Sequence, residues 1–177
     1  MALRYENLEP DVRTCMLQEF EADVAQGTAY ISPRLNAEGV KAWPGLVRDA
    51  IREHDDAWLA DALRAAVFMN AQEQRRTPSG GVTTAKVPAN APEMLAEGEF
   101  NRLYARGLCE NVLACGGSEV EVCRGKEVGN PRPESQAMIG RLIPAQELLD
   151  DLRSSQGVEP ALGLPPGPNS GITVRRA

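Results

Sequence analysis

The stretch from residue 87 to residue 126 constrains the fold more than any other part of the chain. Apolar side chains recur over residues 96–115 at spacings of three and four, which predicts a long amphipathic helix. One face of this helix is expected to join the core, and the other is expected to face water. The polar side chains assigned to the water face are Glu97, Asn101, Arg102, Arg106 and Glu110.

The ends of this helix also have sequence signals. Asn90 and Glu93 have the spacing of a capping box, in which each side chain bonds the other's backbone amide. Gly116 and Gly117 are expected to end the helix, because glycine adopts the left-handed conformation without strain. A short strand is predicted over residues 119–124, where alternate residues are apolar.

The rest of the chain predicts an α+β fold that is mostly α-helical. Other amphipathic helices are expected over residues 9–26, from Pro44 to His54, after Asp55, and from Ile143 onward, with a single helical turn over 36–42. A small β-sheet is predicted from the segments near 28–32, 82–87 and 119–124.

Two parts of the chain lack helical or strand periodicity. Residues 72–85 contain proline and a glycine pair and are expected to form an exposed loop. Residues 158–177 are rich in proline and glycine and are expected to form an extended C-terminal arm. We therefore divide the chain into a core domain over 1–157 and an arm over 158–177. The arm is expected to have too little apolar content to fold on its own.

Composition excludes several classes of protein. The 177 residues carry a net charge of −6, which would repel nucleic acid, so we do not expect sequence-specific nucleic-acid binding. No apolar stretch is long enough to cross a bilayer, and the first residues lack the apolar core of a signal peptide, so no membrane partner is expected.

Catalytic and metal-binding motifs are also missing from the sequence. The four cysteines have no C-x-x-C spacing and are expected to be buried free thiols. His54 is the only histidine, and its place at a helix end beside Asp55 suggests a structural role. The chain has no phosphate loop or nucleophile motif. We therefore predict no enzymatic activity, no cofactor and no metal.

Extended segments that cannot bury themselves usually become ordered against another subunit. We therefore expect the protein to act through protein–protein contacts, including contacts with copies of itself. The predicted partner-binding residues lie in the loop and in the arm: Arg75, Arg76, Gly80, Gly81, Leu162, Leu164, Pro165, Pro166, Ile172 and Val174.

Four runs of the sequence resemble a family of proteins encoded in tailed bacteriophages and prophages. These runs are GTAYISPRL, LAEGEFNRLYARGLC, CRGKEVGNPRPES and ALGLPPGPNSGITV. The resemblance implies a virion structural protein, either a cement or minor capsid protein or a head–tail adaptor. Its partners would be other virion or capsid subunits. It would be found in the virion, and in the cytoplasm of the bacterial host during assembly.

An alternative interpretation is a small helical protein with a regulatory or nucleic-acid-associated role. The basic doublets Arg75–Arg76 and Arg175–Arg176 are the features that favour it. Retention on DNA that falls steeply with salt would support this alternative. An enzyme is a third possibility, for which we find no constellation of residues in the sequence.

Overall fold

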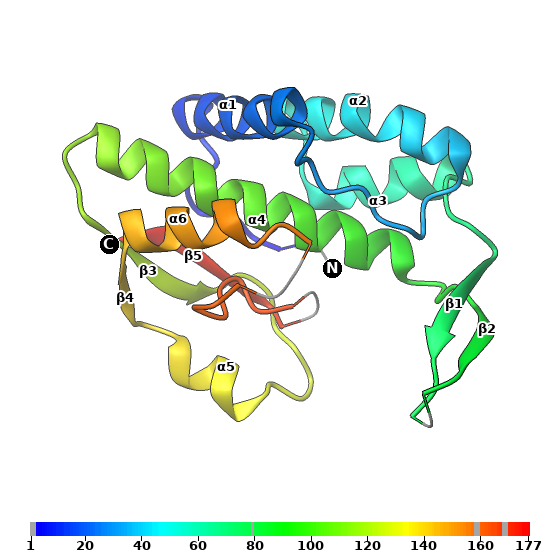
Figure 1. Ribbon diagram of the computed structural model, residues 1–177. Coiled ribbons are helices and arrows are strands. Elements are labelled where there is room, and N and C mark those ends of the chain that lie inside the picture. Colours follow the sequence, from blue (N-terminus) through cyan, green and yellow to red (C-terminus); the bar gives the residue numbers. More distant parts are fainter. Residues whose placement is uncertain (1–2, 79, 158–159, 168–169) are drawn as a thin grey trace.

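The computed structural model describes residues 3–78, 80–157, 160–167 and 170–177. It is an α+β fold dominated by helices, as predicted (Figure 1). The helices are α1 (Pro10–Gln26), α2 (Ala37–Glu53), α3 (Asp56–Ala65), α4 (Ala91–Ala114), α5 (Pro133–Met138) and α6 (Ala145–Ser154). The strands are β1 (Gln72–Arg76), β2 (Val82–Lys86), β3 (Glu119–Arg124), β4 (Leu142–Pro144) and β5 (Ile172–Arg176).

Helix α4 runs through the middle of the molecule and has other elements on both sides (Figure 1). Helices α1, α2 and α3 form the layer on one side. Helix α6 and a three-stranded antiparallel sheet, in the order β4-β3-β5, form the layer on the other. A separate two-stranded antiparallel sheet, β1-β2, projects from one end. The long helix predicted from the sequence is therefore the centre of the fold.

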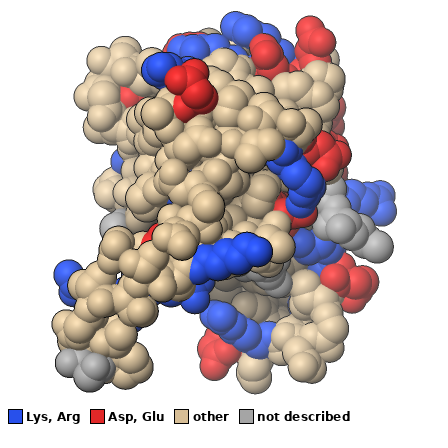
Figure 2. All heavy atoms as spheres, turned by 90° about the vertical axis from the view of Figure 1, so that its right-hand side faces the viewer, with Lys and Arg blue, Asp and Glu red and all other residues tan. Residues whose placement is uncertain are grey.

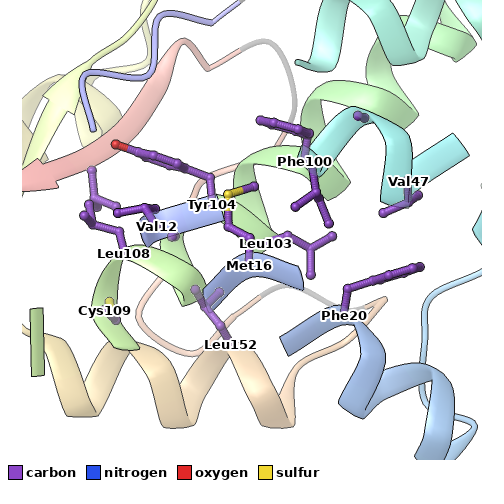
Figure 3. Close-up of a cluster of buried hydrophobic side chains, with 14 of the residues drawn as sticks. Val12, Met16, Phe20, Val47, Phe100, Leu103, Tyr104, Leu108, Cys109 and Leu152 are labelled. Carbon is purple, nitrogen blue, oxygen red and sulfur yellow. The ribbon is translucent and has the colours of Figure 1, made fainter. Parts of the chain in front are cut away.

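The apolar core lies where α4 meets its neighbours. Figure 3 shows side chains from α1, α2, α4 and α6 converging on one cluster. Gly107 of α4 lets α1 approach closely, because a Cβ atom there would lie 2.4 Å from the Cγ atom of Met16 and 2.7 Å from its backbone nitrogen. Gly107 therefore has a packing role, because only a residue without a side chain allows this close approach of α1.

The expectation that one face of α4 is exposed to solvent is wrong. Eighteen residues of the helix are buried, which leaves no continuous face for solvent. Glu97, Asn101, Arg102 and Arg106 are all buried, and Glu110 is half-buried. The reason is that α1, α6 and the C-terminal strand cover the side that the pattern assigned to water.

The buried arginines of α4 are paired with carboxylates of α1 and of α4 itself. Arg106, 2% exposed, donates to Glu19 at 2.8 Å and to Asp23 at 2.6 Å, both on α1. Arg102 donates to Glu99 at 2.5 Å and lies 3.6 Å from Asp23. An unpaired charge in this position would be strongly destabilising, so these pairs are a condition for burying the polar side of α4.

Several local details differ from the predictions. The turn over 36–42 and the helix from Pro44 are one continuous helix, α2, with Pro44 inside it and Asn36 capping the amide of Gly39 at 2.8 Å. Asn90 makes no side-chain capping bond, so the predicted capping box does not form. The caps at Gly27 and Asp55 are confirmed: Gly27 is left-handed, and Asp55 accepts from the amide of Trp58.

The sheet is also arranged differently. Residues 28–32 form no strand, and 72–85, expected to be a loop, instead contain β1 and most of β2. The segment near 82–87 therefore pairs with β1, whereas the predicted strand over 119–124 pairs with β4 and β5. The pairing partners lie far from 119–124 in sequence, and only the tertiary fold brings them together.

The C-terminal segment packs against the chain's own body. Strand β5 pairs with β3 along its length, with Val174 opposite Val122. Leu164, Ile172 and Val174 are each at most 2% exposed. The carboxylate of Asp151 accepts from the amides of Ala161 and Leu162 at 2.9 and 2.7 Å. The expectation that this segment has too little apolar content to fold is therefore wrong.

We expect Gly107→Ala to lower the free energy of unfolding by about 1–3 kcal/mol, because the new methyl group would overlap Met16. Gly45→Ala is the matched control, since Gly45 is an exposed position in α2 with no atom within 4 Å of the added Cβ. The free energy of unfolding of the control variant should rise by about 0.5–1 kcal/mol, because alanine has a higher helix propensity than glycine. Urea unfolding measures both values, and equal effects would contradict the close approach.

We expect Val174→Asp to lower the free energy of unfolding by about 3 kcal/mol or more, because it buries an unpaired carboxylate. Leu162→Asp, a position 36% exposed in the same segment, should change it by less than about 0.5 kcal/mol. Thermal unfolding of the two variants distinguishes a packed strand from an independent arm. An unchanged melting temperature for Val174→Asp would mean that β5 contributes nothing to the core.

Candidate interaction surface

The β1–β2 hairpin extends away from the rest of the molecule. It appears as a separate lobe when the end of the molecule that carries it faces the viewer (Figure 2). Eight of its ten strand residues are exposed, and only Glu73 and Ala85 are half-buried. Within the described residues, no other helix or strand packs extensively against it. Both faces of this small sheet are therefore available to a partner.

The tip of the hairpin has a hydrogen-bonded turn. The amide of Thr77 donates to the carbonyl oxygen of Gly81 at 2.8 Å, and the amide of Gly81 donates to the hydroxyl of Thr77 at 3.0 Å. Gly80 has φ of +83°, a conformation that favours glycine. The two glycines predicted to contact a partner therefore have a definite structural role in closing the turn.

The base of the hairpin is tied to the segment that precedes α2. Arg34 donates to Glu73 at 2.5 Å, and the amide of Asn70 donates to the carbonyl of Arg34 at 2.8 Å. The amide of Val87 closes the hairpin on the carbonyl of Ala71 at 3.1 Å. A hydrogen bond from Arg34 lowers the pKa of Glu73 below its ordinary value, and a second hydrogen bond, from Arg75, lowers it further. These contacts hold the direction of the hairpin with little apolar burial.

The hairpin is locally basic on a chain with net charge −6. Its strands contain Arg75, Arg76 and Lys86 against the single acidic residue Glu73. Arg75 pairs with Glu73, while Arg76 and Lys86 have no ion-pair partner among the described residues. Cationic side chains lie beside the lobe in Figure 2. The surface therefore favours an acidic partner.

The structure does not bring the predicted contact residues into one surface. Arg75, Arg76, Gly80 and Gly81 lie together in the hairpin, and of the arm residues only Leu162, Pro165 and Pro166 remain near the surface. The other three, Leu164, Ile172 and Val174, are buried within the chain.

A pocket of about 500 Å³ is lined by Pro165 and Pro166 of the second group but by none of the predicted contact residues of the hairpin. It is formed by the segment before α2, the first half of α4 and the proline-rich segment, including Arg34, Met94, Pro165 and Pro166. Its buried charges are already paired, as Arg102 is with Glu99. Because Arg34 lines the pocket and also binds Glu73, the hairpin base and the pocket share one side chain.

The sequence interpretation missed the strand pairing of the hairpin. The signal was present: Val82, Thr83 and Thr84 favour a strand, and five residues including two glycines separate β1 from β2. The polar composition of β1, Gln72 to Arg76, hid it, because that strand has no apolar face. The pairing of Arg34 with Glu73, 39 positions apart, has no sequence signal.

The described residues contain no group of three or more histidine, cysteine or acidic side chains placed to hold a metal ion. The ring of His54 stacks on Trp58 at 4.2 Å, which gives the histidine a packing role. All four cysteines are free, but only Cys109 and Cys123 are buried; Cys15 is half-buried and Cys115 exposed. Burial raises the pKa of Cys109 to about 12 and that of Cys123 to about 11, so neither is a thiolate nucleophile at neutral pH.

The most perturbed carboxyl group is Asp56, at the start of α3. Its pKa is raised to about 6, chiefly by burial and also by the charges of Asp55 and Glu97, although a hydrogen bond from the amide of Leu3 acts in the opposite direction. One carboxyl oxygen of Asp56 and the hydroxyl of Tyr5 are buried without a hydrogen-bond partner in the described part of the chain. Neither residue is among those that line the two described pockets.

Comparisons with protein-family models, with curated proteins and with solved structures each find no match. Among the helices that the structure describes, none is long and apolar enough to cross a bilayer. The β1–β2 hairpin is therefore a candidate interaction surface on its own geometry alone.

We expect Asp56→Asn to stabilise the protein at neutral pH but not at about pH 4. The folded pKa of Asp56 lies above its unfolded value of 3.8, so stability is lost as pH rises from about 4 to 6. Asp56→Asn removes this titration, so its free energy of unfolding above pH 6 should exceed that of the unaltered chain by about 2–3 kcal/mol. Urea unfolding at several pH values measures this difference.

The control is Asp61→Asn, on the exposed side of the same helix. Its effect should stay within about 0.5 kcal/mol at every pH, because an exposed ion pair contributes little. A pH-independent gain in Asp56→Asn would show that the carboxyl group has an ordinary pKa.

Proposed function

We propose that this chain is a structural assembly component of a bacteriophage virion, acting as a cement or minor capsid protein or as a head–tail adaptor. It would join neighbouring subunits through the β1–β2 hairpin and would have no catalytic activity. It would occur in the virion and, during assembly, in the cytoplasm of the bacterial host. The resemblance of four sequence runs to tailed-bacteriophage proteins is the reason for naming a virion.

The exposed hairpin is the single observation that supports an assembly role. A two-stranded hairpin is marginally stable in water, because it has few side chains to bury. Here the strands expose eight of ten residues, including Val82 at 66%. Its outer edges also present backbone groups that a neighbouring strand could pair with. A partner subunit would supply the burial that the hairpin lacks.

The arm takes a smaller part in this proposal than the sequence interpretation gave it. Leu164, Ile172 and Val174 already pack within the chain, so a contact made by this segment would use its exposed side chains, such as Leu162. Among the described elements, β1 and β2 pack extensively only against each other, so the hairpin can be altered with little effect on the core.

A second candidate function, nucleic-acid association, is favoured by the charge of the hairpin. Arg75, Arg76 and Lys86 lie on a two-stranded ribbon, and such ribbons can enter a nucleic-acid groove. The net charge of −6 on the whole chain acts against this function. Salt-dependent retention of the purified chain on duplex DNA, lost on Arg75→Glu/Arg76→Glu, would support it.

The test of the assembly role uses particles purified from bacteria that carry the phage or prophage encoding the chain. We expect mass spectrometry to find the chain in particles at a constant ratio to the major capsid protein. The double variant Arg75→Glu/Arg76→Glu should lower this ratio by about tenfold or more, because it reverses the charge of the docking surface.

Lys41→Glu/Arg52→Glu is the matched control, since it makes the same change in charge on the exposed face of α2. The control should enter particles normally. Absence of the unaltered chain from particles would refute a virion role, and equal incorporation of the two double variants would refute the role of the hairpin.

A further inference from the structure

We infer that copies of this chain join head to tail, with strand β2 of one copy added to the open edge of β4 in the next copy. This inference rests on the proposed assembly role and names a partner for the hairpin, namely a second copy of the chain. Its support is the presence of two unpaired strand edges on one molecule, with complementary side chains beside them.

The first open edge is the outer side of β2. The amide of Val87 donates to the carbonyl of Ala71, and Glu73 and Arg75 of β1 lie opposite Ala85 and Thr83 of β2. Bonded pairs alternate in an antiparallel ladder, so Thr83 and Ala85 bond inward to β1. The amides and carbonyls of Val82 and Thr84 therefore point outward, where no other strand of the described chain pairs with them.

The second open edge belongs to β4, at the end of the three-stranded sheet. The amide of Val122 donates to the carbonyl of Arg141, and the amide of Ala145 donates to that of Ser118, both at 2.9 Å. The same alternation leaves the amide and carbonyl of Leu142, which lies between these bonded pairs, on the outer side. This edge therefore offers the donor and acceptor that an added strand requires.

The side chains at the two edges are complementary. Val82 is 66% exposed and Leu142 is 52% exposed, so each edge carries an apolar side chain that pairing would bury. Arg76 and Lys86 are exposed on the hairpin.

Acidic side chains lie beside β4. Glu119 is opposite Pro144 in the ladder, and Glu147 is in the first turn of α6; both are exposed. Neither has an ion-pair partner among the described residues. The exposed cation next to β4 in the sequence is Arg141, which lies opposite Val122 rather than Glu119. The basic hairpin thus meets a mainly acidic edge.

The position of the edges decides the kind of assembly. Figure 1 shows the hairpin at one end of the molecule and β4 toward the other. A contact between two different surfaces is heterologous, and repetition of it produces a closed ring or a helical filament. Such a repeat suits a component that links many subunits of a particle.

The test is sedimentation of the purified full-length chain over a range of concentrations. We expect assemblies larger than a dimer as concentration rises. Thr84→Pro removes an outward amide from β2 and should raise the concentration needed for assembly by about tenfold or more. Gln74→Pro is the matched control: it removes an outward amide from β1, and both variants lose the same Gln74–Thr84 side-chain hydrogen bond.

A second experiment exchanges the charges. Arg76→Glu/Lys86→Glu and Glu119→Lys/Glu147→Lys should each prevent assembly, because like charges then face each other across the interface. Mixing the two variants should restore it, since each hairpin then meets an edge of opposite charge. Restoration depends on the specific pairing and would not follow from a general loss of folding.

A chain that remains a monomer at all concentrations, or equal effects of Thr84→Pro and Gln74→Pro, would overturn this inference. So would a mixture of the charge variants that fails to assemble. Incorporation of the Thr84→Pro chain into particles at the normal ratio would also refute it, while leaving the proposed virion role in place. Absence of the unaltered chain from particles would instead refute the proposed function.

Discussion

The pairing of charges on α4 is the condition on which the rest of the fold depends. Arg106 and Arg102 are buried in the interior and bind carboxylates of α1 and of α4 itself. Although burial acts in the opposite direction, hydrogen bonds from Arg153 and Arg106 lower the pKa of Glu19, which keeps this carboxylate ionised. Removing one partner from such a cluster costs about 3–5 kcal/mol, because the remaining charge stays buried. Because Glu19 of α1 binds both Arg106 of α4 and Arg153 of α6, the cluster links these three helices.

Burying α4 on all sides uses most of the chain, including its last strand. The two layers cover the central helix, and β5 completes the sheet on one side. Within the part of the chain that the structure describes, the β1–β2 hairpin takes little part in this packing. Its direction is held by polar contacts, chiefly Arg34 with Glu73, and its strands carry charge of the opposite sign to the whole chain. An element that contributes so little to the core and yet is well defined at its base is suited to contact with another molecule.

Much of the helical structure could be predicted from the sequence, because caps and periodicity act over a few residues. Pro10, Gly27, Asn36 and Asp55 mark helix ends in the structure as they do in the sequence. The hairpin and the last strand could not be predicted in the same way. Strand β1 is polar on both faces, and β5 lies among prolines and glycines, so neither has the alternation that identifies a strand. Of the predicted contact residues, Arg75 and Arg76 proved to be exposed in the hairpin, whereas Ile172 and Val174 proved to be core residues.

The sequence by itself determined the class of the fold, the central helix and most helix boundaries. These features depend on interactions between residues three or four positions apart, which the sequence displays directly. Only the tertiary structure decided which strands pair and which charged residues are buried. Strand β3 pairs with β5 about fifty residues later, and Arg106 meets Glu19 across 87 positions. Such contacts depend on how the layers close over α4, and neither residue type nor local spacing distinguishes a buried arginine from an exposed one.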